Sequence, residues 1–205
     1  FTEEARAMAR HTVDVLSRED TPVVVPSGSC ADMLIHQAPV LLADQGPYAT
    51  RARALAARTY EFTRFLVDVI KRTDCGACAR GAVTYHPSCH GLRGLAIDHQ
   101  PQALLNGVNG IEIHPLRDAE TCCGFGGLFA VKMSGLSGAM LDRKLDCIEE
   151  SGADTVVATD MSCLMHIAGG LRRRESRVQA RHLAELLAER APKEDAEAGP
   201  ADAGA

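Results

Sequence analysis

Two adjacent cysteines, Cys122 and Cys123, open the glycine-rich segment Gly124-Phe125-Gly126-Gly127, and this segment limits the chemistry of the chain more than any other. Neighbouring cysteines rarely pair with each other, because a disulfide needs Cα atoms about 4.4–6.8 Å apart. A single zinc ion prefers ligands about two to four residues apart. A cluster of several iron atoms accepts adjacent thiolates, and glycines let the backbone approach a bulky inorganic group with its N–H groups toward the sulfurs. The pair by itself leaves a multi-iron site and two buried structural thiols equally open, and the rest of the chain decides between them.

Composition narrows the class of protein. The 205 residues fit one or two domains, and a net charge of −5 argues against a dominant basic face for nucleic acid. The sequence has neither an apolar run of about 18 residues nor a signal peptide, so we expect no membrane span and a reducing, cytoplasmic setting. In that setting, eight cysteines indicate metal or redox chemistry. The chain begins with Phe1 inside a helical pattern, so we expect it to be a fragment.

Hydrophobic patterns predict strands that alternate with helices. The predicted strands are 21–25 (buried), 82–86, 111–114 and 155–159. The predicted helices are 3–17, one beginning at 31, 48–70, 91–105, 136–151, 164–174 and 180–190. This alternation predicts an α/β fold with small parallel sheets flanked by helices.

The sequence also indicates an internal repeat. The segment 23–30 aligns with 156–163, each a strand followed by Ser-Cys and a helix, 133 residues apart. We therefore expect two similar modules: residues 1–72 as the C-terminal part of the first, residues 73–190 as the complete second, and 191–205 as a disordered tail. The sequence upstream of the first module is expected to hold a second Cys-Cys-Gly.

Four cysteines of the second module, Cys89, Cys122, Cys123 and Cys163, lie where loops leave strands or enter helices. If the strands are parallel neighbours, these loops share one edge of the sheet, where α/β proteins place ligands. Ser88-Cys89 and Ser162-Cys163 fall at predicted helix starts, which favour a thiolate. Four converging thiolates suit an iron–sulfur cluster better than one zinc ion.

These motifs resemble the cysteine-rich (CCG) domain iron–sulfur proteins. The resemblance covers about residues 1–190 and rests on Ser-Cys89, Glu-Thr-Cys122-Cys123-Gly-Phe-Gly-Gly, Asp-Met-Ser-Cys163-Leu-Met-His and Pro-Ser-Gly-Ser-Cys30. It is closest to the lactate-utilisation protein A family, and more distant to the heterodisulfide reductase B subunit and the iron–sulfur subunit of glycolate oxidase. Members of the family carry two CCG modules.

The resemblance implies a cytoplasmic electron-transfer subunit without catalytic residues of its own, acting in the oxidation of L-lactate to pyruvate or of a related 2-hydroxy acid. Its partners would be a ferredoxin-like iron–sulfur protein and a third subunit. A cluster, of the [4Fe-4S] type, would be held by Cys89, Cys122, Cys123 and Cys163, while Cys30 would belong to the cluster of the first module. The wider CCG pattern ends in Cys-x-x-Cys, but His166 stands where the second thiol of the later pair would be. His166 is then either a nitrogen ligand or a hydrogen-bonded histidine.

Several alternatives remain open at this point. A zinc-binding structural or interaction module would use the same thiols, and a thiol enzyme would use Cys122 or Cys123 as nucleophile. Cys75 and Cys78 have the spacing of a zinc half-site but no second pair, and Cys147 is interpreted as a packed small hydrophobe. His86 and His90 flank Cys89, either beside the site or hydrogen-bonded at the surface. The glycines after Cys123 lack the G-x-G-x-x-G spacing of a dinucleotide loop.

Overall fold

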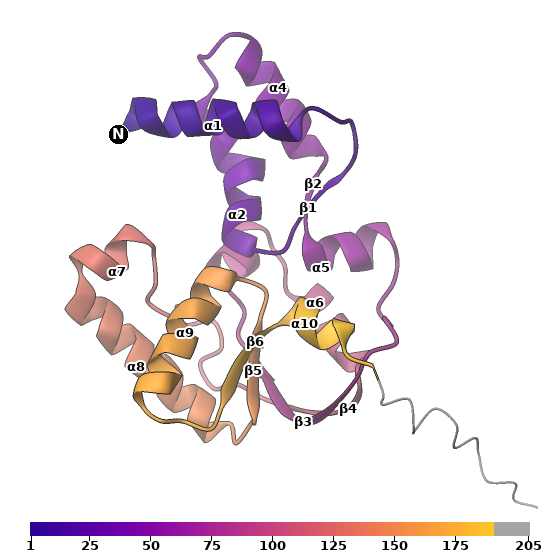
Figure 1. The fold of residues 1–205 in the computed structure, drawn as a ribbon, viewed down its shortest axis with the longest axis vertical. Coiled ribbons are helices and arrows are strands. Elements are labelled where there is room, and N and C mark those ends of the chain that lie inside the picture. The colour runs from indigo at the N-terminus through magenta and orange to yellow at the C-terminus, as the bar shows by residue number, and fades with distance from the viewer. Residues whose placement is uncertain (191–205) are drawn as a thin grey trace, which may run out of the picture.

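A four-stranded sheet forms the centre of the larger part of the molecule (Figure 1). The computed structural model describes residues 1–190. In sheet order the strands are β4 (Asn109–His114), β3 (Cys78–Tyr85), β5 (Thr155–Ala158) and β6 (Gln179–His182). All three pairings are parallel. The carboxyl ends of these strands therefore meet at one edge of the sheet, as the sequence predicts.

Helices cover both faces of this sheet, which explains why its strands are so apolar. Val157 packs in a core with Leu104, Leu105 and Leu186, whereas its neighbour Val156 packs on the other face with Leu145. The helices on the first face are α6 (His99–Asn106) and α10 (Leu183–Ala188). Those on the second are α8 (Ser134–Glu150) and α9 (Met161–Arg173), with the short α7 (Leu128–Lys132) leading into α8.

The smaller part of the molecule is built around a parallel pair of strands, β1 (Val23–Val25) and β2 (Thr59–Glu61). Its helices are α1 (Thr2–Leu16), α2 (Gly28–Asp32), α3 (Ala38–Leu41), α4 (Pro47–Ala57) and α5 (Phe62–Arg64). Two π-helical turns, η1 (Met33–Gln37) and η2 (Phe65–Val69), continue α2 and α5. Val13, Leu42 and Leu55 form the core of this part.

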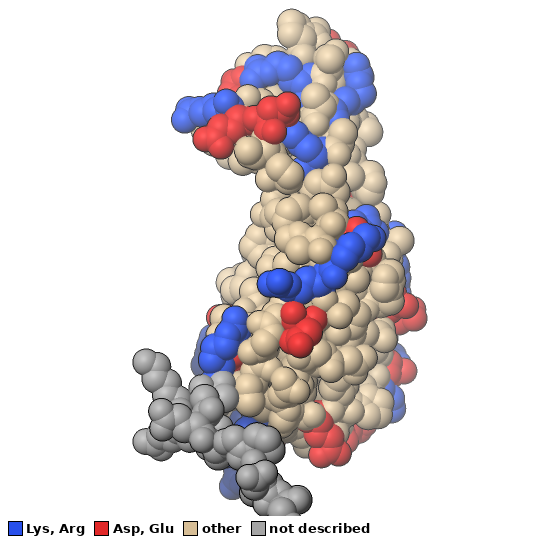
Figure 2. All heavy atoms as spheres, turned by 90° about the vertical axis from the view of Figure 1, so that its right-hand side faces the viewer, with Lys and Arg blue, Asp and Glu red and all other residues tan. Residues whose placement is uncertain are grey.

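Contacts around α2 join the two parts. Ala31 packs with Leu95 and Ile97 of the larger part, and the Ser29 backbone N–H donates to Asp160 at 2.7 Å. The space-filling view shows a narrowing between the parts, with Lys and Arg interspersed with Asp and Glu over the visible face (Figure 2). The α/β prediction is thus confirmed, whereas the repeat and the module boundaries stay predictions. The predicted disordered tail, 191–205, lies outside the described residues.

Three predicted elements are wrong in part. The helix expected over 48–70 is interrupted by β2, because Thr59 and its neighbours extend to pair with β1. The helix expected over 180–190 begins as β6, which adds to β5 before α10 starts. The helix expected over 91–105 is divided into the π-helical turn η3 (His90–Gly94) and α6. In each case pairing or packing with distant residues overrides the local helical pattern.

The strand expected at 21–25 is not buried. It is shortened to β1, and Val24 exposes 37% of its surface, while Val23 and Val25 are half-buried. The strand therefore has one open face, following the period of two that a strand imposes.

Glu61, the last residue of β2, gives the fold a pH-dependent contribution. Its Oε2 accepts hydrogen bonds from the Thr63 and Arg64 backbone N–H groups at 2.8 and 3.1 Å, while its buried Oε1 has no partner among the described residues. Burial raises the pKa of this carboxyl above its ordinary value, although the hydrogen bonds oppose the shift. A raised folded-state pKa means that the folded state binds the proton more tightly than the unfolded chain.

We therefore expect Glu61 to contribute most to stability below pH 4.5, the ordinary pKa of a glutamate, and to lose that contribution as pH rises through its folded-state pKa. Glu61→Gln removes the titration, so the free energy of unfolding of the wild type should decline relative to this variant over that pH window. Urea unfolding at a series of pH values measures the difference. Glu4→Gln, at an exposed position of α1, is the control, and parallel pH profiles for wild type and Glu61→Gln would contradict the prediction.

Candidate metal centre

A cavity of about 270 Å³ lies at the carboxyl edge of the larger sheet. The loops after the adjacent strands β3 and β5 both contribute to it. These two loops diverge, because the chain passes from β3 to β4 on one side of β3, while β5 lies on the other side. Such a point is where parallel α/β sheets form a binding crevice. The lining residues are Ser29, Ser88, Cys89, His90, Cys122, Cys123, Phe125, Gly126, Gly127, Asp160, Ser162 and Cys163.

Four of the five predicted cysteine ligands meet in this cavity. Cys89 follows β3 at the start of η3, Cys122 and Cys123 lie in the loop between β4 and α7, and Cys163 lies in the first turn of α9. Cys123 and Cys163 are buried, and Cys89 and Cys122 are half-buried. The fifth, Cys30, is exposed on α2 and is not among the residues that line the cavity.

The thiols are close enough to control one another's ionisation. Cys123 and Cys89 hydrogen-bond to Cys122 and strongly lower the pKa of its thiol. The same contacts with Cys122 raise the pKa of Cys89 and of Cys123, and burial adds to both shifts. Neighbouring thiols cannot all become thiolates unless a positive charge lies among them. The donor set therefore fits a metal group that binds several sulfurs at once.

Contacts with α8 hold the loop that carries Cys122 and Cys123. Ser137 Oγ donates to the Gly124 carbonyl at 2.8 Å, and the Gly124 N–H donates to Cys122 Sγ at 3.3 Å. The side chain of Lys144 is completely buried, and its Nζ donates to the Asp118 and Ala119 carbonyls at 2.7 and 3.1 Å. Burial lowers the pKa of this ammonium, which lies on the thiol side of α8. The loop is thus fastened before and after the cysteine pair.

Asp160 positions Cys163 and joins it to the smaller part of the molecule. It is the N-cap of α9, where Oδ1 accepts from the Ser162 and Cys163 backbone N–H groups at 3.1 and 3.5 Å. Its Oδ2 accepts from the Ser29 N–H. Burial opposes ionisation, but these hydrogen bonds outweigh it and lower the pKa of the carboxyl. Cys163 therefore lies at the positive end of a 13-residue helix, beside the backbone N–H groups of its first turn.

His86 is a site residue for which the sequence leaves two interpretations open. It follows β3 directly and exposes only 1% of its surface. One of its ring nitrogens and the Sγ atoms of Cys123 and Cys163 all lie within 4.8 Å of one another. Burial, with a smaller effect of Lys144, lowers the pKa of His86 to about 4, so the ring is neutral at pH 7. Of these two interpretations, a place beside the site agrees with the structure, and a hydrogen-bonded surface residue does not. Its place at a strand end, like that of the thiols, is the signal that points to the site.

The other two histidines considered from the sequence, His90 and His166, each have a polar partner in the protein. His166 Nε2 lies 3.4 Å from Ser137 Oγ, and its ring centroid lies 5.7 Å from that of Phe125. This is the arrangement of a hydrogen-bonded histidine. His90 is exposed, and its Nδ1 lies 3.0 Å from Asp32 Oδ2.

Residues 83–168 match the family model of the CCG cysteine-rich domain. The chain is 46% identical over 187 residues to lactate utilization protein A of Macrococcus caseolyticus, covering 91% of this chain and 76% of that protein. It is 43% identical over 187 residues to lactate utilization protein A of Geobacillus sp. (91% and 78%) and 41% over 185 residues to that of Bacillus cereus strain G9842 (90% and 77%). The chain belongs to the lactate utilization protein A family. The resemblance inferred from the cysteine motifs is thereby confirmed.

The CCG match in this lactate utilization protein A family member contains His86 and the four clustered thiols, whereas Cys30 precedes it. The remaining cysteines lie away from the cavity lining. Cys147 is buried on α8, and Cys75 and Cys78 lie half-buried before and at the start of β3.

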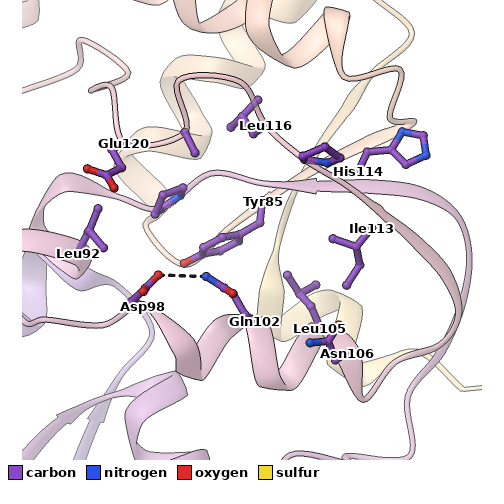
Figure 3. A pocket seen from close by; sticks show the side chains of 13 residues that line it. Tyr85, Leu92, Asp98, Gln102, Leu105, Asn106, Ile113, His114, Leu116 and Glu120 are labelled. Carbon is purple, nitrogen blue, oxygen red and sulfur yellow. Dashed lines mark hydrogen bonds between the residues drawn. The ribbon is translucent and has the colours of Figure 1, made fainter.

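A second cavity, of about 340 Å³, lies beside the metal centre of this family member (Figure 3). Tyr85 is prominent in it, and Gln102 Nε2 donates to Asp98 Oδ1 at 3.0 Å on its floor. Its walls include Leu92, Leu105, Ile113 and Leu116. Pro87 and Glu120 also line it, so it borders the segments that lead to Cys89 and Cys122.

Proposed function

We propose that this chain is an iron–sulfur electron-transfer subunit that acts in the oxidation of L-lactate to pyruvate. The observation that carries the proposal is the convergence of four thiols, two of them adjacent in sequence, on one cavity at the carboxyl edge of a parallel sheet. The substrate follows from family membership, since the similar proteins carry the name lactate utilization protein A.

The chain's residues have separate roles in this proposal. Cys89, Cys122, Cys123 and Cys163 hold a cluster, of the [4Fe-4S] type, which takes up and passes on single electrons when bound. Gly124 and Asp160 hold the loop and the helix that present three of these thiols. Lys144 places a buried positive charge behind them, which favours the reduced, more negative state of the centre. In this proposal these residues carry electrons and take no step on lactate itself, and the chain is a non-catalytic or co-catalytic subunit beside the partner that oxidises lactate.

Electron transfer requires partner proteins, and the surface beside the cavity suits them. Leu128 and Val131 on α7, next to Gly126 and Gly127, expose 63% and 77% of their surface. Met161 and Met165 on α9 are also exposed. Exposed apolar groups of this kind mark interaction surfaces. We propose a ferredoxin-like iron–sulfur protein and a third subunit as partners, in the cytoplasm; none of the helices among residues 1–190 is both long and apolar enough to cross a membrane.

Cys30 has a separate place in the proposal. It belongs to the first of two CCG modules, with residues 1–72 as part of that module and 73–190 as the second. Its exposure on α2 and its absence from the cavity lining agree with a role outside the cluster of the second module.

One observation favours a second candidate, a structural zinc site. His86, Cys123 and Cys163 offer three ligand atoms close enough for a single ion, and zinc binds such mixed sets of sulfur and nitrogen. Zinc has no redox chemistry, so this reading would make the chain an interaction module.

Metal analysis separates the two candidates. Full-length protein purified without oxygen is expected to contain iron with matching acid-labile sulfide and a visible absorbance that bleaches on reduction. Zinc in place of iron and sulfide would overturn the electron-transfer proposal and support the structural site. Protein with neither metal would contradict both.

A further inference from the structure

His86 is an exception to the rule that buried polar groups are paired. Its ring exposes 1% of its surface, and neither Nδ1 nor Nε2 has a hydrogen-bond partner among the described residues. A buried imidazole without a partner is unfavourable, because its nitrogens have lost water and gained nothing in exchange. Such a group in a folded protein indicates a partner that the polypeptide itself does not supply.

The surroundings of His86 indicate what that partner is. One ring nitrogen shares a space with Cys123 Sγ and Cys163 Sγ, all within 4.8 Å of one another. The two thiols come from different elements, the loop after β4 and the start of α9, while His86 follows β3. Three separate segments thus bring one nitrogen and two sulfurs to one point, and all three residues are buried. Nitrogen and sulfur together form the donor set of iron or zinc.

We propose that His86 is a nitrogen ligand of the metal centre, bound to the same group as Cys123 and Cys163. The inference rests on the proposed iron–sulfur function and adds a nitrogen ligand to its sulfur ligands. His86 follows β3, which lies in the sheet between β4 and β5, the strands that precede the two thiol-bearing segments. His166, the other imidazole considered, is excluded from this role because its Nε2 faces Ser137 Oγ and its ring packs on Phe125.

A nitrogen ligand has consequences for the centre. A neutral imidazole as the fifth ligand leaves the iron less negatively charged than a fifth thiolate would, and so gives the centre a higher reduction potential, as histidine ligands do in other clusters. His86 would then set the potential at which this centre accepts electrons. The buried ammonium of Lys144 acts in the same direction.

The test uses full-length protein purified without oxygen, in which iron and sulfide are first measured. Wild-type protein grown with ¹⁵N-labelled histidine is compared with unlabelled protein by pulsed EPR in the paramagnetic state of the cluster. We expect a strongly coupled nitrogen whose signal changes with the isotope. His86→Ala should lose that signal and release iron to a chelator of the order of ten- to a hundredfold faster. His86→Cys should lose the nitrogen signal but retain iron, because a thiolate replaces the imidazole.

His166→Ala is the matched control and should keep both the nitrogen signal and the iron. The labelled wild-type protein answers the question even if His86→Ala fails to fold. Iron and sulfide without a strongly coupled histidine nitrogen would overturn the assignment of His86 and leave the proposed function standing. Loss of the signal in His166→Ala alone would also overturn it. Absence of iron and sulfide from the wild type would overturn the proposed function and, with it, the assignment of His86 as a ligand of an iron–sulfur cluster.

Discussion

Replacing Cys123 with serine is expected to abolish the visible absorbance of the protein and to remove its iron and sulfide. Cys123 is almost completely buried, and its thiol lies beside those of Cys122 and Cys163, so its loss leaves a gap in the middle of the donor set. A serine hydroxyl does not ionise near neutral pH and is a poor ligand for iron in a sulfur site. The fold should persist, with about 1–3 kcal/mol lost because a hydroxyl is buried in a core. Absorbance, metal analysis and urea unfolding measure these effects.

Cys147→Ser is the matched control for this prediction. Cys147 is as buried as Cys123, at 1% against 2% exposed, but it lies on α8 outside the cavity lining. It should lose a similar amount of stability and keep all of its iron. Loss of iron from both variants would mean that iron retention follows stability alone. An unchanged spectrum in Cys123→Ser would remove Cys123 from the site.

The place of the site was predictable because it depends on connectivity. A strand that ends in a polar turn followed by a helix can be recognised locally, and parallel pairing then brings such ends to one edge. Cys89, Cys122, Cys123 and Cys163 satisfy this rule, and the parallel order β4-β3-β5-β6 brings them together. The adjacent pair by itself argues against a disulfide between its two members and against a single zinc ion.

His86 and Lys144 were not predictable in the same way. A histidine that closely follows a strand can be exposed, like His90 at the start of η3, or buried, like His86, and only the packing of distant segments decides between them. Lys144 occupies a helical position where a lysine normally reaches solvent, and its burial depends on the loop of residues 118 and 119 closing over it. The type of a residue and its neighbours in the sequence do not show whether distant segments will bury it.

The missed strands have a related cause. β2 and β6 are short, and their residues are compatible with a helix until a partner strand is present. Each pairs with a strand that precedes it in the chain by at least one helix: β2 pairs with β1, and β6 pairs with β5. The gain from completing a sheet outweighs the small local preference for helix.

Gly124→Ala is expected to lower both the stability of the protein and its iron content, because this glycine holds the cysteine loop against α8. Its φ is +90°, which L-residues rarely adopt, and a Cβ here would lie 2.6 Å from the Ser137 carbonyl oxygen and 2.9 Å from Met140 Cβ. Since the Ser137 oxygen belongs to the helix backbone, the loop must move instead. Backbone strain and overpacking together should lower the free energy of unfolding by about 2–5 kcal/mol.

The displacement should also reach the metal centre, because Gly124 N donates to Cys122 Sγ and its carbonyl accepts from Ser137 Oγ. We therefore expect Gly124→Ala to lose iron as well as stability, with all cysteines present. Gly76→Ala is the matched control: its φ is +66°, but a Cβ there meets nothing within 4 Å and Gly76 does not line the cavity, so only about 1–2 kcal/mol should be lost and iron retained. Urea unfolding and iron analysis on both variants measure this. Equal losses of stability and iron in the two variants would contradict the prediction, because backbone strain alone would then account for both. Iron loss confined to Gly124→Ala would establish that the packing of the cysteine loop against α8 positions the thiols.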